Sequence, residues 1–336
     1  MILVDPYPRT LDQIFSSEAR RRIEALGPVT WHDGSPAEDA LVEPLLPGLV
    51  AVVGQTALPS RRLAQAPRLR AVLNVEGNFL PNVDYTGCFA RGIEVLGIGP
   101  VFGQPVAEMA LGLALAAARD IPRGDAEIRA RTEALFDEGV NGRSFLLASK
   151  TVGLVGCGNL GRALLPLLHP FGCTVLAHDP WLGDAVLRGL GVEPVALLEL
   201  FARSRVVFVL SPPTTENTGA IGTTCFGAMA PGSVVVLVSR AAVVDWRALL
   251  DAASSGHIRV AADVFPQEPI PADEPARSTV GTILSAHRAG NVPEIWRDVG
   301  EMVAADLEAV FAGARPTRMQ PADPATVERL RSRPIG

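Results

Sequence analysis

Residues 151–164 read Thr-Val-Gly-Leu-Val-Gly-Cys-Gly-Asn-Leu-Gly-Arg-Ala-Leu. The first five form a short apolar run that is typical of a fully buried strand. The next six place Gly156, Gly158 and Gly161 in the spacing Gly-x-Gly-x-x-Gly. Asp179 follows eighteen residues after Gly161, behind a second apolar run at residues 174–177. A strand, this glycine spacing, a helix and a later acidic residue together predict a dinucleotide-binding unit.

Each of these residues has a separate task in such a unit. Gly156 permits the tight turn, Gly158 lets the backbone approach a pyrophosphate, and Gly161 lets the helix pack closely on the strand. The first helical turn offers N–H groups and partial positive charge to the phosphates. We expect Asp179 to bond the ribose hydroxyls of an adenosine and to repel a 2′-phosphate, which favours NAD over NADP. Arg188 leaves the NADP alternative open.

Short apolar runs alternate with helical stretches on both sides of this motif, a pattern typical of parallel sheets covered by helices. Before it, strands are predicted at residues 49–54, 69–75 and 93–98, and helices at 10–26 and 60–66. After it, strands are predicted at 174–177, 206–210, 234–238, 260–262 and 282–284. Irregular structure is predicted at 121–149 and a surface loop in the proline-rich stretch 266–275, and a polar tail with several prolines follows residue 311.

Two long helices, predicted at residues 104–120 and 293–311, flank the second series of strands. This arrangement predicts that one domain is inserted into another. The predicted fold class is α/β, with two Rossmann-like domains that contain parallel sheets. Residues 1–102 and 291–336 would form the first domain, and residues 103–290 would form the inserted one, which carries the glycine motif.

Composition narrows the function classes. The 336 residues carry a net charge of −6, so the chain has no excess of positive charge for nucleic acid. The most apolar helical run, 109–118, is shorter than the about 20 residues that a bilayer span needs, and the N-terminus lacks the basic region of a signal peptide. The four cysteines show no Cys-x-x-Cys spacing, and no metal-ligand spacing is present. We expect a cytoplasmic protein without nucleic-acid, membrane or metal partners.

Polar residues follow several of the predicted strands. In an open α/β sheet, ligands bind beyond the carboxyl ends of the strands. Ser211, Arg240, Asp263 and His287 each follow a predicted strand within three residues, and Glu268 lies five residues after Asp263.

Four sequence blocks, in the same order and at similar spacing, resemble those of the D-isomer-specific 2-hydroxyacid dehydrogenases. They are the glycine motif with Asp179, then residues 238–245, 263–269 and 284–287. The resemblance covers nearly the whole chain. It implies a flavodoxin-like substrate-binding domain beside the NAD-binding Rossmann domain, NAD (NADH) as cofactor, and a homodimer with residues 100–150 as its interface.

The resemblance also implies a reaction, the interconversion of a 2-oxo acid and a (2R)-2-hydroxy acid by hydride transfer. Arg240 would grip the substrate carboxylate and 2-oxygen, because its planar fork matches a carboxylate. His287 would be the general acid in reduction and the base in oxidation, and Glu268 would orient it. The small anionic substrate would lie between the domains, which would close on it. The implied cofactor contacts are Gly156, Gly158, Asn159, Leu160, Gly161, Asp179, Ser211, Pro212, Val238, Ser239, Asp263 and Gly290, of which Asp263 and Ser211 would contact the nicotinamide or its ribose.

The chain departs from the family pattern at candidate substrate-binding residues. The glycine-bearing loop of the first domain is longer here, and it carries Glu76 before Gly77 and Asn78. Gly77 and Asn78 can offer N–H groups to a carboxylate. Glu76 would repel an anionic substrate unless it meets a cation or a substrate amine or hydroxyl, and a solvated loop carboxylate is the alternative. Arg288 could read a second anionic group, or pair with Glu76 or Glu294.

Two other functions stay open. One is a phosphite- or formate-type dehydrogenase on the same scaffold, a function that is compatible with Glu76 and the altered loop. The other is a non-enzymatic NAD sensor that resembles the family's transcriptional corepressors, because such proteins can keep the catalytic residues. The lack of long interaction tails argues against the sensor.

Overall fold

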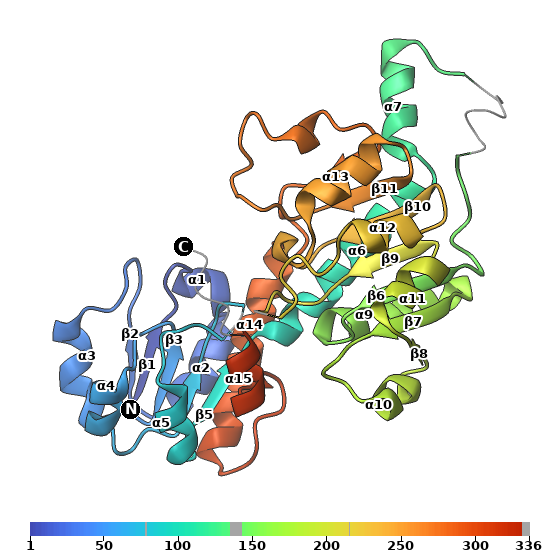
Figure 1. Cartoon of the computed structure of the whole chain (residues 1–336). Helices are drawn as coiled ribbons and strands as arrows, with labels where there is room; N and C mark the ends of the chain where they lie inside the picture. Colours follow the sequence, from blue (N-terminus) through green and yellow to red (C-terminus); the bar gives the residue numbers. More distant parts are fainter. Residues whose placement is uncertain (78, 135–142, 215, 331–336) are drawn as a thin grey trace. The chain divides into compact units, whose positions relative to one another are not determined.

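The computed structural model describes every residue except 78, 135–142, 215 and 331–336. The chain packs into two compact units (Figure 1). The first unit contains Met1–Phe102 and Val292–Gly336, and the second contains Gly103–Asn291. The chain therefore leaves the first unit, builds the whole second unit, and then returns.

The first unit contains a sheet whose strands run in the order β13-β5-β4-β3-β1-β2. Strands β1 to β5 are parallel to their neighbours, and β13 pairs antiparallel with β5. The strands are β1 (Ile2–Asp5), β2 (Val29–Trp31), β3 (Ala51–Gly54), β4 (Ala71–Leu73), β5 (Glu94–Gly97) and β13 (Gln320–Pro321). The helices are α1 (Leu11–Ile14), α2 (Ser17–Ala25), α3 (Asp39–Leu45), α4 (Ser60–Gln65), α5 (Tyr85–Ala90), α14 (Pro293–Phe311) and α15 (Pro324–Leu330).

Both faces of this sheet are covered because side chains alternate along each strand. Ile2 and Val4 of β1 pack in a core cluster with α2 and α14, which contribute Ile23 and Val303. Leu3 faces the other way, into a second cluster with residues of α3, α4 and α5. Strands buried on both faces explain the continuous apolar runs of the sequence.

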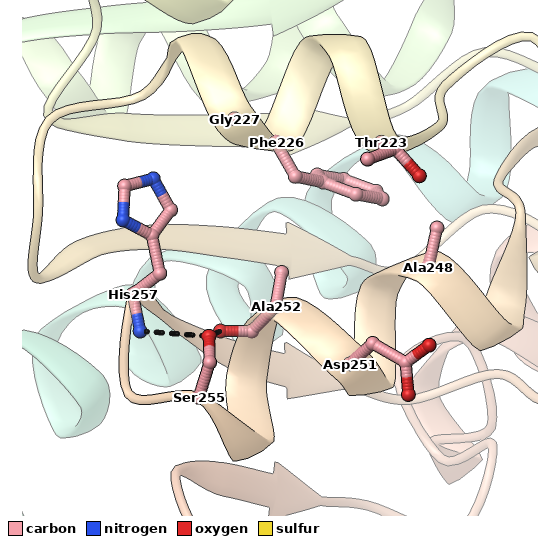
Figure 2. A pocket seen from close by; sticks show the side chains of 8 residues that line it. All are labelled: Thr223, Phe226, Gly227, Ala248, Asp251, Ala252, Ser255 and His257. Carbon is pink, nitrogen blue, oxygen red and sulfur yellow. Dashed lines mark hydrogen bonds between the residues drawn. The ribbon is translucent and has the colours of Figure 1, made fainter.

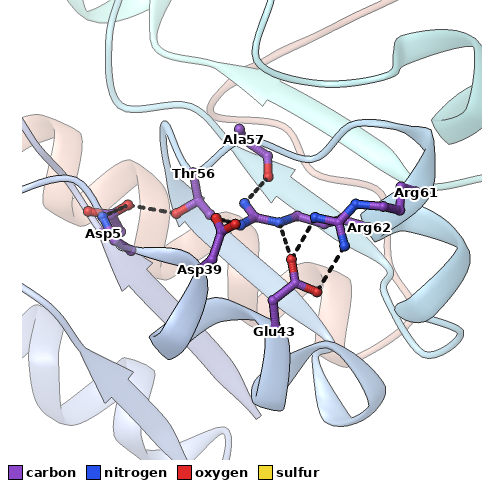
Figure 3. Close-up of polar contacts among 8 residues, drawn as sticks. Asp5, Asp39, Glu43, Thr56, Ala57, Arg61 and Arg62 are labelled. Atoms are coloured by element: carbon purple, nitrogen blue, oxygen red, sulfur yellow. Dashed lines mark hydrogen bonds and ion pairs between the residues drawn. The ribbon is translucent and has the colours of Figure 1, made fainter.

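Charged groups also join the elements on the second face (Figure 3). Arg62 of α4 is only 5% exposed. Its guanidinium donates to Asp39 and Glu43 of α3 and to the carbonyl of Ala57. Its charge is therefore paired as well as hydrogen-bonded, which a buried cation requires.

The second unit contains a fully parallel sheet in the order β12-β11-β10-β9-β6-β7-β8. The order reverses between β6 and β9, which is where dinucleotides bind in Rossmann folds. The strands are β6 (Thr151–Val155), β7 (Thr174–His178), β8 (Glu193–Pro194), β9 (Val206–Val209), β10 (Ser233–Leu237), β11 (Ile258–Ala262) and β12 (Thr282–Leu284). The helices are α6 (Gly103–Ala118), α7 (Ile121–Ala130), α9 (Asn159–Leu168), α10 (Asp184–Gly189), α11 (Leu197–Arg203), α12 (Thr223–Ala228) and α13 (Trp246–Ser254).

Helix α6 is apolar nearly all round. The segment Gly99–Ala118, with a mean hydropathy of 1.4, is long and apolar enough to cross a membrane by length and composition alone, so the expectation of a shorter run was wrong. In the structure α6 packs against α9 and beside β10 and β11, with Val106, Ala110 and Leu113 buried. A core helix passes the same composition test, and its packing accounts for its apolar surface.

Two of the predictions were wrong. Residues 121–149, predicted as irregular, contain helix α7, and the polar tail after residue 311 contains β13 and α15, which were not predicted. The helix predicted over residues 10–26 is divided into α1 and α2, because Ser16 caps α2 by accepting a hydrogen bond from the Ala19 N–H. A serine hydroxyl at this position satisfies a backbone donor that would otherwise be unpaired.

Candidate active site

The glycine turn between β6 and α9 has the geometry that a dinucleotide requires. Gly156 has a φ of +92°, and a Cβ added there would lie 2.8 Å from the backbone nitrogen of Ser211. A Cβ on Gly161 would lie 2.9 Å from the carbonyl oxygen of Gly156, so the helix and turn pack too closely for a side chain. Gly158 instead faces open space. Gly158 is the N-cap of α9 and makes no side-chain cap hydrogen bond, and a helix N-terminus is a favourable place for an anion.

Asp179 follows β7 and is anchored at this turn. Its Oδ2 accepts a hydrogen bond of 2.8 Å from the Cys157 N–H, and its Oδ1 accepts from the N–H groups of Trp181 and Leu182. A carboxylate has about four acceptor positions, so capacity remains for ribose hydroxyls. Arg188, the residue that left NADP open, pairs with Asp184 on α10 at 3.0 Å.

Ser211 follows β9, the neighbour of β6 in the sheet, and Ser239 follows β10, the strand beyond β9. Their hydroxyl oxygens are buried and have no hydrogen-bond partner in the part of the chain that the structure describes. Val238 and Ser239 are themselves about 5% exposed. Orphaned buried hydroxyls require a ligand or water, so they fit the cofactor contacts that were predicted for them.

The remaining predicted cofactor contacts lie beside these groups in the chain. Asn159 and Leu160 begin α9, and Pro212 opens the loop after Ser211. The carbonyl of Pro212 accepts a hydrogen bond from the Asn217 amide, which holds that loop. Gly290 follows the turn of His287 to Ala289.

His287 and Glu268 form a hydrogen-bonded pair. The imidazole Nδ1 lies 2.5 Å from Glu268 Oε2, and the other carboxylate oxygen accepts a hydrogen bond of 2.9 Å from the Phe265 N–H. The carboxylate is thereby fixed to the backbone and selects the tautomer with hydrogen on Nδ1. Nε2 of His287 has no hydrogen-bond partner among the described residues, so it can exchange a proton with a bound molecule. The predicted dyad is present as a contact.

Asp263 holds the turn that carries His287. Its side chain is fully buried, and its two carboxylate oxygens each accept a hydrogen bond of 2.9 Å, from Arg288 and Ala289. Its carbonyl accepts from the His287 N–H at 2.8 Å. His287 has a φ of +50°, a left-handed conformation that costs a non-glycine residue about 1–3 kcal/mol. Asp263 compensates for this conformation, and its contact with nicotinamide or ribose stays a prediction.

Arg240 follows β10 at the same edge of the sheet. Its Nη1 donates a hydrogen bond of 2.7 Å to the carbonyl of Ser239, and the other guanidinium nitrogens make no hydrogen bond within the described residues. Burial lowers the pKa of Arg240, and the charge of Glu268 raises it in turn, so the guanidinium senses the carboxylate of the dyad. A desolvated guanidinium with open donors is suited to bind a carboxylate.

The predicted substrate residues of the first unit have a partner that the sequence analysis missed. Glu76 accepts a hydrogen bond of 2.8 Å from Nε of Arg9 and is therefore not a solvated loop carboxylate. Gly77 follows it, and Asn78 lies outside the described residues. Arg9 lies four residues after β1, so a search of strand ends in the first unit would have found it. Arg288, in the second unit, has an exposed side chain.

A separate pocket of about 260 Å³ lies between α12 and α13, lined by Phe226, Ala248, Asp251, His257 and their neighbours (Figure 2). It contains none of the predicted site residues. This pocket is therefore distinct from the candidate active site.

The chain matches known proteins along most of its length. Residues 111–289 match the model of the family described as D-isomer specific 2-hydroxyacid dehydrogenase, NAD binding domain. A D-3-phosphoglycerate dehydrogenase of Mycobacterium tuberculosis is 33% identical over 286 residues, which are 85% of this chain and 53% of that protein. The chain thus spans about half the length of that curated relative.

Two further proteins are matched over nearly their whole length. A glyoxylate reductase of Korarchaeum cryptofilum is 30% identical over 86% of this chain and 88% of its own. A crystal structure of a phosphoglycerate oxidoreductase from Rhizobium etli is 39% identical and superimposes with a TM-score of 0.87, covering 96% of this chain and 98% of that one. The two-domain α/β architecture predicted from the sequence is confirmed by this likeness.

Proposed function

Because the chain belongs to the D-isomer-specific 2-hydroxyacid dehydrogenase family, we propose that it interconverts a 2-oxo acid and a (2R)-2-hydroxy acid by hydride transfer. The second unit carries the family's NAD-binding domain, so NAD(H) is the cofactor. When bound, NAD(H) accepts or supplies the hydride at carbon 2. The glycine turn, Asp179, Ser211 and Ser239 would hold it.

The observation that supports this function most directly is the contact between His287 and Glu268. In reduction, Nε2–H of His287 donates its proton to the 2-oxygen as hydride reaches carbon 2, and in oxidation Nε2 takes that proton back. Glu268 stabilises the imidazolium that supplies the proton. Arg240 binds the substrate carboxylate and polarises the 2-oxygen.

The test is NADH oxidation against a panel of 2-oxo acids that runs from glyoxylate and hydroxypyruvate to aromatic, dicarboxylic and phosphorylated acids. Formate and phosphite with NAD, and NADPH in place of NADH, complete the panel. We expect turnover of at least one 2-oxo acid, and a product with the R configuration. No turnover of any 2-oxo acid, with NADH still bound, would contradict the proposal and favour the sensor.

Variants separate chemistry from cofactor binding. His287→Ala and Arg240→Ala should each lower kcat/KM by about 10²–10⁴-fold, because each removes a group that acts on the reacting atoms. Both should still bind NADH, measured by quenching of protein fluorescence. His169→Ala, at the far end of α9 from the glycine turn, is the matched control and should keep full activity.

The chain is further proposed to be a cytoplasmic homodimer with residues 100–150 as the interface. Ile121, Ile128 and Leu146 support the interface, because each is an apolar side chain more than half exposed in the single chain. All four cysteines are free thiols, in keeping with a reducing compartment. Light scattering should give twice the mass of the chain, and Ile128→Glu should give the single chain. A monomeric parent protein would overturn the interface.

A further inference from the structure

Three loops of the first unit meet where neighbouring strands end. Strands β4, β3 and β1 are adjacent and parallel, so the loops that follow them leave the same edge of the sheet. Each of these loops brings one polar side chain there: Arg9 after β1, Gln55 after β3 and Glu76 after β4. The carboxyl edge of a parallel sheet is where open α/β domains bind ligands.

Glu76 and Trp296 hold the guanidinium of Arg9 in one place. Its Nε donates to Glu76 Oε1 at 2.8 Å, and its guanidinium carbon lies 4.1 Å from the ring centre of Trp296 on α14. The amide of Gln55, with its nitrogen turned toward Tyr7, donates to the Tyr7 carbonyl and accepts from the Glu76 N–H at 2.8 Å. The guanidinium is therefore oriented before any ligand arrives.

The pairing of Arg9 with Glu76 uses only Nε, so the two terminal nitrogens of the guanidinium stay available for a ligand. In the same unit, Arg22 grips Glu308 with two bonds, from Nε at 2.8 Å and from Nη2 at 2.7 Å. Arg9 uses Nε alone on Glu76, and its Nη1 and Nη2 have no partner among the described residues. A pair that served only to join two elements would gain from the double contact that Arg22 makes. About one third of the Arg9 side chain is exposed, so the open end is accessible.

We propose that Arg9 determines substrate specificity by binding a second anionic group of the substrate through Nη1 and Nη2. The class of substrate is a 2-oxo or 2-hydroxy acid with a carboxylate or phosphate beyond the reacting carbon. Glu76 is the positioning residue, which holds Nε and leaves the two-nitrogen fork to the ligand. This inference rests on the proposed function, because the loop of Glu76 and Gly77 is its predicted substrate loop.

The experiment compares acids that differ only in the second anion. Hydroxypyruvate is paired with 3-phosphohydroxypyruvate, and 2-oxopentanoate with 2-oxoglutarate, so the first pair tests phosphate and the second tests carboxylate. The readout is the ratio of kcat/KM for the dianion to that for its partner. Arg9→Gln should lower this ratio about 10- to 100-fold for the anion that the site takes, because a charge-assisted bond is lost.

Further variants separate recognition from structure. Arg9→Lys keeps the charge but loses the fork, and it should recover only part of the ratio. Glu76→Gln keeps an acceptor for Nε and removes a negative charge, so the ratio should rise. Arg21→Gln, an exposed arginine of α2 with its own acidic partner, should leave the ratio unchanged. An equal loss for both acids of each pair in Arg9→Gln would overturn the proposal, because a structural role would lower both.

A binding measurement keeps this inference distinct from the proposed function and covers the case in which Arg9→Gln fails to fold. With NADH present, D-3-phosphoglycerate should raise the melting temperature more than D-glycerate does, and Arg9→Lys should lose most of that difference. If no 2-oxo acid is reduced but this difference is seen, the proposed activity fails and the anion site stands. An equal rise in the parent protein and in Arg9→Lys would overturn the site.

Discussion

The imidazole Nδ1 of His287 lies 2.5 Å from Oε2 of Glu268, and a third residue holds the backbone that makes this contact. Glu268 fixes the ring, whereas Asp263 fixes the left-handed turn that bears it. One carboxylate, that of Glu268, therefore orients the imidazole ring, and another, that of Asp263, stabilises the backbone conformation. Because the two tasks are separate, variants of the two carboxylates should fail differently.

Glu268→Gln should impair proton transfer without unfolding the protein. The amide keeps the size of the carboxylate but removes the charge that stabilises the imidazolium. His287 donates the proton in reduction, so without this charge kcat/KM for reduction should drop about 10- to 100-fold. The measurement is kcat/KM, with thermal unfolding measured beside it. Glu199→Gln, on the exposed face of α11, is the control, and an unchanged kcat/KM in Glu268→Gln would contradict the role.

Asp263→Asn should lower both stability and turnover. An amide NH2 would face one of the two backbone N–H groups that the carboxylate accepts, leaving a buried donor unpaired at a cost of about 1–3 kcal/mol. His287 would then leave its strained conformation more often, so kcat should fall more than the affinity for NADH. Thermal unfolding and NADH titration check this. Asp251→Asn, a well-exposed residue of α13, should change neither, and a selective loss of NADH affinity in Asp263→Asn would support the predicted cofactor contact instead.

Strand β6 and helix α14 could be predicted from the sequence because burial leaves a run or a repeating pattern of apolar residues. Strands β6 and β12 and helix α14 have the bounds that the pattern predicts, Thr151–Val155, Thr282–Leu284 and Pro293–Phe311. Strands β8 and β13 escaped prediction. Each has two residues, and each exists through pairing with a neighbour, such as Gln320 opposite Gly97, rather than through its own pattern.

The site residues of the second unit were predicted from their positions just after strands. Position along the chain does not give the direction of a side chain or its partner in another loop. The rule for strand ends placed Arg240, Asp263 and His287 at one edge, but it does not tell which way a side chain faces. The buried carboxylate of Asp263 accepts hydrogen bonds from the backbone N–H groups of Arg288 and Ala289. The pairing of Arg9 with Glu76 joins loops 67 residues apart. These loops are neighbours because β1, β3 and β4 are adjacent in the folded sheet, and this strand order was not predicted from the sequence.

Asp179→Ser should shift cofactor preference toward NADPH. The negative charge that repels a 2′-phosphate is lost, and the ribose hydroxyls lose a strong acceptor, so the ratio of kcat/KM for NADPH to NADH should rise about tenfold or more. The serine hydroxyl is too short to keep all three backbone contacts of the carboxylate, so a modest loss of stability should accompany the shift. Asp12→Ser, at an exposed position of α1 where the carboxylate pairs with Arg20, is the control. An unchanged ratio would mean that Asp179 serves only the turn.

Cys88 should make the stability of the protein decrease in alkali. Burial, with a smaller contribution from Asp84, raises the pKa of this fully buried thiol to about 11. The unfolded thiol ionises near pH 8.5, so above that pH the unfolded state loses its proton first and the folded state loses relative stability. For this one thiol the loss should reach about 2 kcal/mol by pH 10. Urea unfolding at pH 7 and pH 10 measures it. Cys88→Ala should be less stable at pH 7 but should lose less on going to pH 10, and an equal loss in both proteins would show that the thiol ionises alike in the folded and unfolded states.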